Sequence, residues 1–151
     1  LEHDEYLRKQ ANNIDENSVS LLTGAELEAG KKTFVTICAA CHKADGGGMV
    51  GPNLTDDYWI HGGSLKDIFK TIKYGVPEKG MISWKEQLSP QQIAQVANYI
   101  LTLHGTNPPG AKEKQGDLYV PQDAGAAATD TTKVKADTTA TAMPKDTVKN
   151  K

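Results

Sequence analysis

The sequence predicts an all-α fold: a small domain of three main helices joined by long loops. Apolar residues recur at helical spacing in three segments in the middle of the chain. No two runs alternate in the manner of paired strands. The loops between the helical segments, at 45–57 and 76–83, are rich in glycine or contain proline. Long loops in a small domain usually wrap around something, so a bound group is expected.

Composition excludes several classes of function. The chain has 151 residues and a formal net charge of −2, so charge gives no basis for binding nucleic acid or an anionic membrane surface. No apolar run approaches the roughly 20 residues of a membrane span. Leu, Ile, Val and Phe number only 29, so the core is small and a large apolar ligand would help to fill it. The chain begins at Leu1 without Met, as a processed or excised piece would.

The first segment and the first main helix differ in composition. Residues 1–22 are polar and are predicted to form an N-terminal linker or extension with at most a weak helical pattern. The first main helix is expected to begin at Thr23, because Thr23 and Glu26 have the spacing of a capping box. Its apolar face would carry Leu27, Phe34, Ile37 and Cys38.

The second main helix is expected to begin at Ser64 and to end at Gly75. Ser64 is a good N-cap residue and Asp67 follows three residues later. Glycine is the usual residue just beyond a helix C-terminus. The apolar positions recur at i, i+3, i+4 and i+7, at Leu65, Ile68, Phe69 and Ile72.

The third main helix has the strongest start signal. Ser89 can act as N-cap, Pro90 occupies the first helical position and Gln92 the third. Gly105 is expected to end the helix. Its apolar stripe consists of Ile93, Val96, Ala97, Ile100 and Leu101.

A change of composition near residue 121 divides the rest of the chain. The segment 121–151 holds seven Thr, seven Ala, five Lys and four Asp, and its only Leu, Ile, Val or Phe residues are Val134 and Val148. Such a segment buries too little apolar surface to offset its ordering entropy. We therefore predict a folded domain over 23–120 and a disordered tail over 121–151.

Both cysteines lie in the run Cys38-Ala39-Ala40-Cys41-His42, for which four interpretations compete. A thioredoxin-like redox pair belongs in a βαβ unit, which the pattern does not show. A zinc site needs four ligands, and no second pair follows at finger spacing. A disulfide between residues this close would be strained and would close only a short loop. The fourth interpretation is the C-x-x-C-H motif that attaches a c-type haem.

Helical geometry favours the haem interpretation. Cysteines three residues apart on a helical turn project from one side, where two thioether bonds would hold the macrocycle. His42 would then offer its imidazole to the iron as the proximal ligand. This use consumes both thiols, Cys38 and Cys41, and leaves no cysteine over.

A haem iron needs a sixth ligand or an open position. Met81 is favoured, because it lies 39 positions after His42, which lets the second main helix pass along the haem edge before the chain reaches the distal face. A methionine ligand raises the reduction potential. Met49 and His61 are the alternative ligands, and a methionine that only fills the core is a further alternative.

Other residues are candidates for supporting contacts. The Pro52 carbonyl could accept a hydrogen bond from the imidazole of His42, although a Gly-Pro pair could simply shape a turn. Trp59 and His61 could hydrogen-bond the haem propionates or stand at the surface. Three lysines could surround an exposed haem edge and steer an acidic redox partner, or only form a solvated face: Lys73, Lys79 and Lys85.

Taken together, these motifs resemble the class I cytochromes c over about residues 23–105. The resemblance is carried by Gly30 and Phe34 before the cysteine motif, Gly51-Pro52-Asn53-Leu54 after it, Met81 with Trp84, and Tyr99 with Ile100 on the last helix. It implies that fold around one covalent haem c, with His42 and Met81 as iron ligands and the Pro52 carbonyl behind His42. It also implies haem contacts by Leu54 and Trp84, and a crossing of the first and last helices at Gly30 and Tyr99.

Two longer runs, at 53–63 and 74–84, resemble more closely the haem c domain in the cytochrome subunit (subunit III) of cbb-type haem–copper oxidases. The similarity extends through 105–109. That subunit is membrane-anchored and usually carries two haem c domains. The chain therefore resembles one such domain, either excised from a larger subunit or existing as a separate relative.

The resemblance implies electron transfer in a respiratory chain rather than enzymatic turnover. Electrons would pass from an upstream donor, through the haem, to the catalytic subunit of the oxidase on the periplasmic side. The membrane would be reached only through an anchor or the complex. Three alternatives remain: a free periplasmic shuttle cytochrome, a haem-based gas sensor with a displaceable distal ligand, and a plain helical module with an accidental motif.

Overall fold

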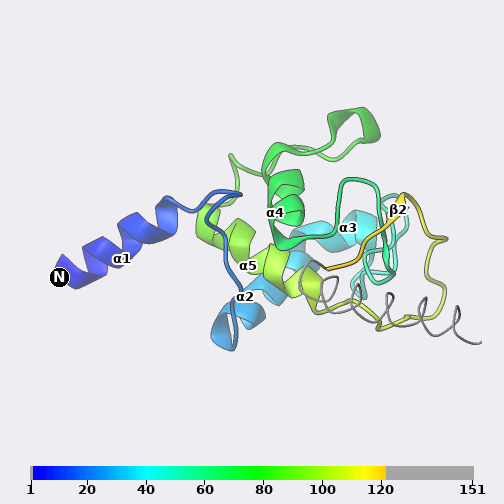
Figure 1. Ribbon diagram of the computed structural model, residues 1–151, viewed down its shortest axis with the longest axis horizontal. Coiled ribbons are helices and arrows are strands. Elements are labelled where there is room, and N and C mark those ends of the chain that lie inside the picture. Colours follow the sequence, from blue (N-terminus) through cyan, green and yellow to red (C-terminus); the bar gives the residue numbers. More distant parts are fainter. Residues whose placement is uncertain (1, 122–151) are drawn as a thin grey trace, which may run out of the picture. The chain divides into compact units, whose positions relative to one another are not determined.

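The computed structural model describes residues 2–121. Its elements are α1 (Glu2–Asn12), α2 (Ala25–Thr33), the π-helical turn η1 (Phe34–Cys38), α3 (Ala39–His42), β1 (Tyr58–Trp59), α4 (Leu65–Tyr74), the 3₁₀ turn η2 (Pro77–Lys79), α5 (Pro90–Leu101) and β2 (Asp117–Leu118). Helices dominate, as predicted (Figure 1). The predicted tail lies outside the described residues except for Pro121.

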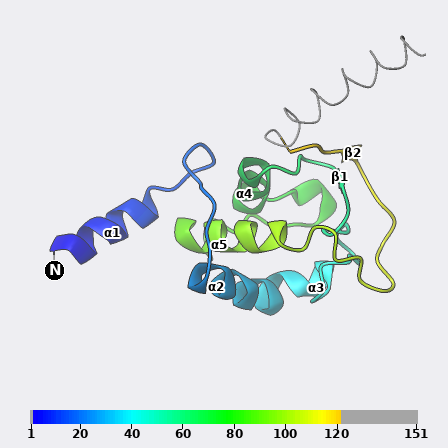
Figure 2. The ribbon, with the colours of Figure 1, turned by 60° about the horizontal axis from the view of Figure 1, so that its bottom comes forward.

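The packing of α2 against α5 organises the core, and α4 packs on α5 (Figure 2). At the crossing, Gly30 approaches α5 so closely that a Cβ atom on it would lie 2.1 Å from the Gln95 carbonyl oxygen. The rings of Phe34 and Tyr99 pack beside it with their centroids 5.5 Å apart. The predicted crossing at Gly30 and Tyr99 is therefore confirmed.

Substituting this glycine tests the crossing. Gly30→Ala would place a methyl group against backbone atoms, which cannot move aside as a side chain could. We expect the free energy of unfolding to fall by about 2–3 kcal/mol, since overpacking outweighs the gain in helix propensity. Denaturant titration measures the loss. Glu28→Ala, on an exposed position of the same helix, should change it by less than about 0.5 kcal/mol; equal stability of the two variants would contradict the close approach.

The starts of α4 and α5 follow the predicted capping signals. The Ser64 hydroxyl accepts a hydrogen bond from the Asp67 amide at 3.0 Å. Ser89 and Gln92 form the reciprocal bonds of a capping box. The buried faces of these two helices meet in the core through Ile68, Phe69, Ile72, Ile93, Val96, Ala97 and Ile100.

The predicted start of the first main helix and the predicted end of the third are wrong. The first main helix begins at Ala25 with Gly24 as N-cap, and Thr23 forms no capping box. The reason is that the Glu26 carboxylate instead accepts hydrogen bonds from two glutamine amides of α5, at 2.6 Å each. The third main helix ends at Leu101 rather than at Gly105, because its last turn closes through a bond from the Thr102 hydroxyl to a backbone carbonyl.

The N-terminal extension is more regular than the sequence predicts. It contains α1, which has acidic residues in its first turn and a Lys9–Glu5 ion pair at 3.2 Å, both favourable to a helix. The following linker is held to α5 by the buried Asn98, whose side chain accepts from the Leu22 amide and donates to the Ser20 carbonyl. The linker is therefore part of the folded unit.

One short β-ladder was not predicted from the sequence. β1 and β2 pair antiparallel, with Tyr58 opposite Leu118 and Trp59 opposite Asp117. Two residues a strand are too few to produce a recognisable alternation. The pairing brings the segment that follows α5 back beside the middle of the chain (Figures 1 and 2).

Candidate functional site

A cavity of about 460 Å³ lies among η1, α3, α4 and the loops that follow them. The nine residues expected to attach, ligate or contact the haem all line it: Cys38, Cys41, His42, Pro52, Leu54, Trp59, His61, Met81 and Trp84. Most other lining residues are apolar, among them Phe34, Ile37, Ile68, Ile72, Val76 and Ile100. A volume of this size lies within the roughly 300–1,000 Å³ of small-molecule and cofactor sites.

His42 ends α3 with its imidazole held in one orientation. Its Nδ1 lies 3.0 Å from the Pro52 carbonyl oxygen, and because a carbonyl only accepts, Nδ1 carries the proton and Nε2 keeps a free lone pair. Burial lowers the pKa of His42. The hydrogen bond to Pro52 raises this pKa, and the charge of Lys112 lowers it further, so that the net change is downward. The result is a neutral imidazole, the form that binds a metal.

The backbone at Gly51 lies in close contact with the imidazole of His42. A Cβ atom at Gly51 would lie 2.5 Å from Cε1 of His42, so only glycine fits there. The Gly51 amide donates to the Cys41 carbonyl at 2.8 Å, and the Gly48 amide donates to the His42 carbonyl at 2.9 Å. The loop is thereby fixed to the helical turn that carries the ring.

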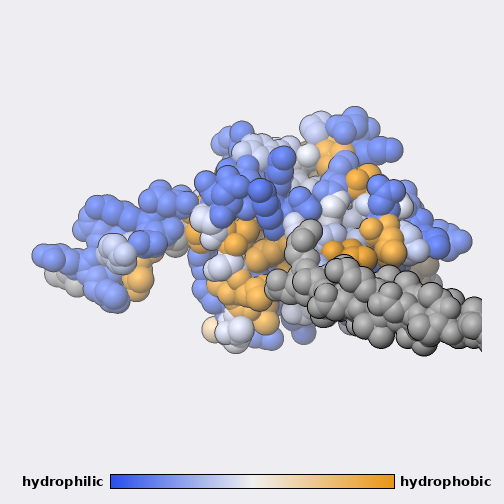
Figure 3. Space-filling view, viewed as in Figure 1, coloured by the Kyte–Doolittle hydropathy of each residue, from blue (hydrophilic) through white to orange (hydrophobic). Residues whose placement is uncertain are grey.

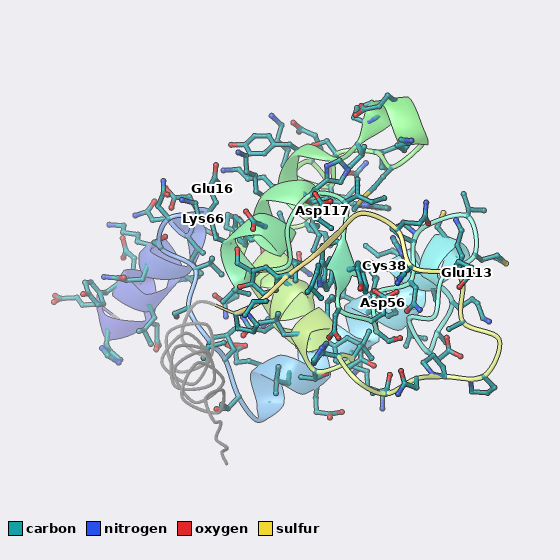
Figure 4. All side chains as sticks on the ribbon, turned by 45° about the vertical axis from the view of Figure 1, so that its right-hand side comes forward. Glu16, Cys38, Asp56, Lys66, Glu113 and Asp117 are labelled. Atoms are coloured by element: carbon teal, nitrogen blue, oxygen red, sulfur yellow. The ribbon has the colours of Figure 1, made fainter. Side chains whose placement is uncertain are left out.

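The two cysteines come from the turn where η1 passes into α3. Neither is in a disulfide. Cys38 (labelled in Figure 4) is partly buried and Cys41 is exposed, although both line the cavity. Burial first, and the neighbouring Cys41 second, raise the pKa of Cys38 to about 11. Cys38 is therefore a thiol at neutral pH rather than a thiolate.

Met81 is held in the cavity wall by a tight loop. Its amide and carbonyl exchange hydrogen bonds with Val76 at 3.1 and 2.8 Å, and η2 forms the turn between them. Beyond it, the Ser83 hydroxyl donates to the Lys73 carbonyl at 2.6 Å. Of the two alternative ligands, Met49 is 55% exposed and lies outside the lining, whereas His61 is exposed but borders the cavity.

The three lysines of the expected ring lie in different surroundings. Lys79 lines the cavity. Lys73 instead forms an ion pair with Glu16 of the linker at 3.3 Å, and the ammonium of Lys85 lies 5.6 Å from the centroid of the Tyr74 ring. The structure therefore brings only one of the three to the cavity.

The rim of the cavity is apolar where it meets solvent. Val50, Ile60 and Ile82 line the cavity and are 68%, 40% and 51% exposed. On the face drawn in Figure 3, hydrophobic side chains gather over α2 and α5 and on the loop beyond α4, within a mainly hydrophilic surface.

Several lining residues were not predicted from the sequence, among them Lys112 and Gln115. They follow α5 and return to the cavity with the segment that contains β2. No helical period or motif marks them in the sequence. Their position depends on the pairing of β2 with β1, which is a contact between distant parts of the chain.

Two other types of site are not formed in the described part of the chain. Within residues 2–121, no three His, Cys, Asp or Glu side chains gather to hold a bare metal ion. The cysteine turn is followed by helical and loop structure rather than by a βαβ unit.

Within residues 2–121, no helix is both long and apolar enough to cross a membrane.

Comparison with known proteins identifies relatives over the same residues. Residues 25–100 match the family described as cytochrome c oxidase, cbb3-type, subunit III. The chain is 35% identical over 123 residues to the cbb3-type cytochrome c oxidase subunit CcoP of Azospirillum sp. (strain B510), covering 73% of this chain and 42% of that protein. It is 39% identical over 109 residues to the subunit FixP of Azorhizobium caulinodans, covering 65% of this chain and 37% of that protein.

Two further facts describe these similarities. The chain spans about two fifths of the length of the curated relatives it matches. Among solved structures, cytochrome cL from Hyphomicrobium denitrificans is similar with a TM-score of 0.50 and 22% identity, covering 73% of this chain and 69% of that one. This likeness concerns the fold alone.

Proposed function

The chain belongs to the cbb3-type cytochrome c oxidase subunit III family, and on this premise we propose that its described unit is a mono-haem electron-transfer domain with iron ligated by His42 and Met81. Haem c is the cofactor of such cytochromes. When bound, haem supplies an iron that gains and loses one electron. The protein sets the reduction potential of this iron through the axial ligands and the surroundings of the haem. The observation that carries the proposal is the gathering of all nine candidate residues around one cavity.

The residues present fit this cofactor. The cavity is mainly apolar and offers one imidazole whose Nε2 is free and whose Nδ1 is bound to Pro52. The two thiols are three residues apart where η1 passes into α3, both line the cavity, and neither is in a disulfide. Cys38 and Cys41 would hold the macrocycle by adding their S–H groups across its two vinyl groups, a step that requires no oxidant. His42 would be the proximal ligand.

Met81 is proposed as the second ligand because the loop that carries it is rigid. The paired backbone bonds to Val76 and the bond from Ser83 to α4 fix the backbone around Met81, whose side chain lines the cavity. A ligand held by its own loop remains in place when the iron changes its oxidation state, which keeps the reorganisation energy small. Trp84, Leu54 and Trp59 would exclude water from the cofactor.

The family suggests the direction of electron flow. Both relatives are named as subunits of a cbb3-type oxidase, so we propose that this domain delivers electrons to the catalytic subunit of such an oxidase. The apolar rim formed by Val50, Ile60 and Ile82 is the surface through which electrons would enter or leave. The domain itself would turn over no substrate, and its location would be periplasmic, on the side where haem c is attached. A free shuttle cytochrome is the second candidate.

Carbon monoxide distinguishes electron transfer from gas sensing. The protein, matured in a host that attaches haem c, is reduced and exposed to carbon monoxide at neutral pH. We expect the visible spectrum to stay unchanged, because Met81 holds the sixth position. A rapid and complete change to a carbon monoxide spectrum would favour the sensor and overturn the proposal. Oxidation of the reduced protein by membranes that contain a cbb3-type oxidase, but not by membranes lacking it, separates the oxidase partner from the shuttle.

A further inference from the structure

The segment after α5 is built into the candidate site although it lies beyond residues 25–100, which the family model matches. We call residues 106–119 the strap. The Lys112 amide donates to the Gly47 carbonyl at 2.8 Å, and the Asn53 side-chain amide donates to the Lys112 carbonyl at 3.1 Å. Further along, β2 pairs with β1. The strap is thus attached at two points, at Lys112 and at β2, to the segment between His42 and α4 (Figure 2).

This attachment places the side chain of Lys112 at the cavity. Its backbone is fixed by two hydrogen bonds, so the side chain has a short and defined reach. The ammonium lies 3.4 Å from the Val50 carbonyl oxygen, which is its single hydrogen-bond acceptor among residues 2–121. An ammonium has three donors, so two remain for a ligand. The half-buried side chain lines the cavity, and its charge acts on His42.

The cavity contains cations and no carboxylate among the described lining residues. The titratable groups that face it are Cys38, Cys41, His42, His61, Lys79 and Lys112. On the strap, Glu113 is exposed at the margin of the unit and is outside the lining (Figure 4). A haem carries two propionate carboxylates, and a carboxylate removed from water requires a charged or hydrogen-bonding partner.

We propose that the ammonium of Lys112, together with the side-chain amide of Gln115, which also lines the cavity, binds one carboxylate of the cofactor and so couples the strap to the reduction potential. The inference rests on the proposed function. Lys112 is a cofactor-binding residue under this proposal, and the strap is a functional part of the domain rather than a connection to the tail.

The pH profile of the reduction potential tests this on the haem-loaded full chain. In the native protein, Lys112 keeps the carboxylate ionised to low pH. In Lys112→Met, the carboxylate should take up its proton about one pH unit or more higher. Protonation removes negative charge and therefore raises the potential. We expect the variant to have a lower potential than the native protein at alkaline pH, with a rise that begins at higher pH as the solution is acidified.

Two companion variants separate charge from packing. Lys114→Met removes a cation of the same strap that lies over the Tyr58 ring, 4.5 Å from its centroid, outside the cavity lining; its profile should match the native one. Lys112→Arg keeps the charge and should restore the native profile. If Lys112→Met fails to mature, Lys112→Gln takes its place in the same comparison. Superposition of the Met or Gln profile on the native one would overturn the proposal.

The same experiment keeps this inference separate from the proposed function. A native protein without covalent haem would contradict the function itself. A native protein with haem, together with an unchanged profile in the Lys112 variants, would contradict only the role of Lys112.

Discussion

Replacing Met81 by alanine is expected to lower the reduction potential and to open the iron to external ligands. The loop between Val76 and Met81 is closed by its own backbone bonds, so it should keep its shape without the thioether and leave a gap at the sixth position. Loss of a methionine ligand should lower the potential by on the order of tenths of a volt, within the roughly 0.8 V range that axial ligands span. Equilibrium redox titration and carbon monoxide binding to the reduced protein measure the two effects.

Met49→Ala is the matched control for this substitution. Met49 is 55% exposed and does not line the cavity, so its removal should alter neither the potential nor the spectrum. A Met81→Ala protein with the native spectrum and potential would show that the ligand assignment is wrong. An effect in Met49→Ala alone would move the assignment to that residue.

Gly51→Ala should impair the other side of the site. The added methyl group would lie 2.5 Å from Cε1 of His42, so the ring must tilt and lose its hydrogen bond to the Pro52 carbonyl. Overpacking of this kind costs about 1–3 kcal/mol, and here the strain falls on the proposed iron ligand. We expect a reduced yield of haem-loaded protein and a lower thermal midpoint, accompanied by a weakened low-spin spectrum.

The location of the defect distinguishes a positioning effect from general instability. Gly30→Ala should lower stability by a similar amount while leaving the spectrum of the surviving protein native, because Gly30 faces α5 rather than His42. A Gly51→Ala protein with a native spectrum and native stability would contradict the close contact between this loop and the imidazole.

Features encoded by neighbouring residues could be predicted from the sequence. The caps at Ser64 and Ser89 are confirmed because each depends on a residue three positions away. The crossing at Gly30 joins distant segments and was expected only from the resemblance to the class I cytochromes c; it is confirmed by the close approach of Gly30 to the backbone of Gln95. The nine candidate residues gather around one cavity because the cysteine turn, the loop after it and the loop after α4 each carry a recognisable local motif.

Features that depend on distant contacts could not be predicted. Thr23 forms no capping box because the Glu26 carboxylate accepts hydrogen bonds from Gln91 and Gln95 of α5, which lie 65 and 69 residues further along the chain. Lys73 does not contribute to the expected lysine ring because its ammonium binds Glu16, 57 residues away in the sequence. Lys112 reaches the cavity only through the return of the strap. No local pattern in the sequence encodes these partners.

The mass of the intact protein, matured in a host that attaches haem c, tests the central claim most directly. The account predicts the polypeptide mass increased by that of one haem, with the added mass located by peptide mapping on the segment that contains Cys38 and Cys41. The unmodified polypeptide mass, with both thiols free to react with an alkylating reagent after denaturation, would contradict it.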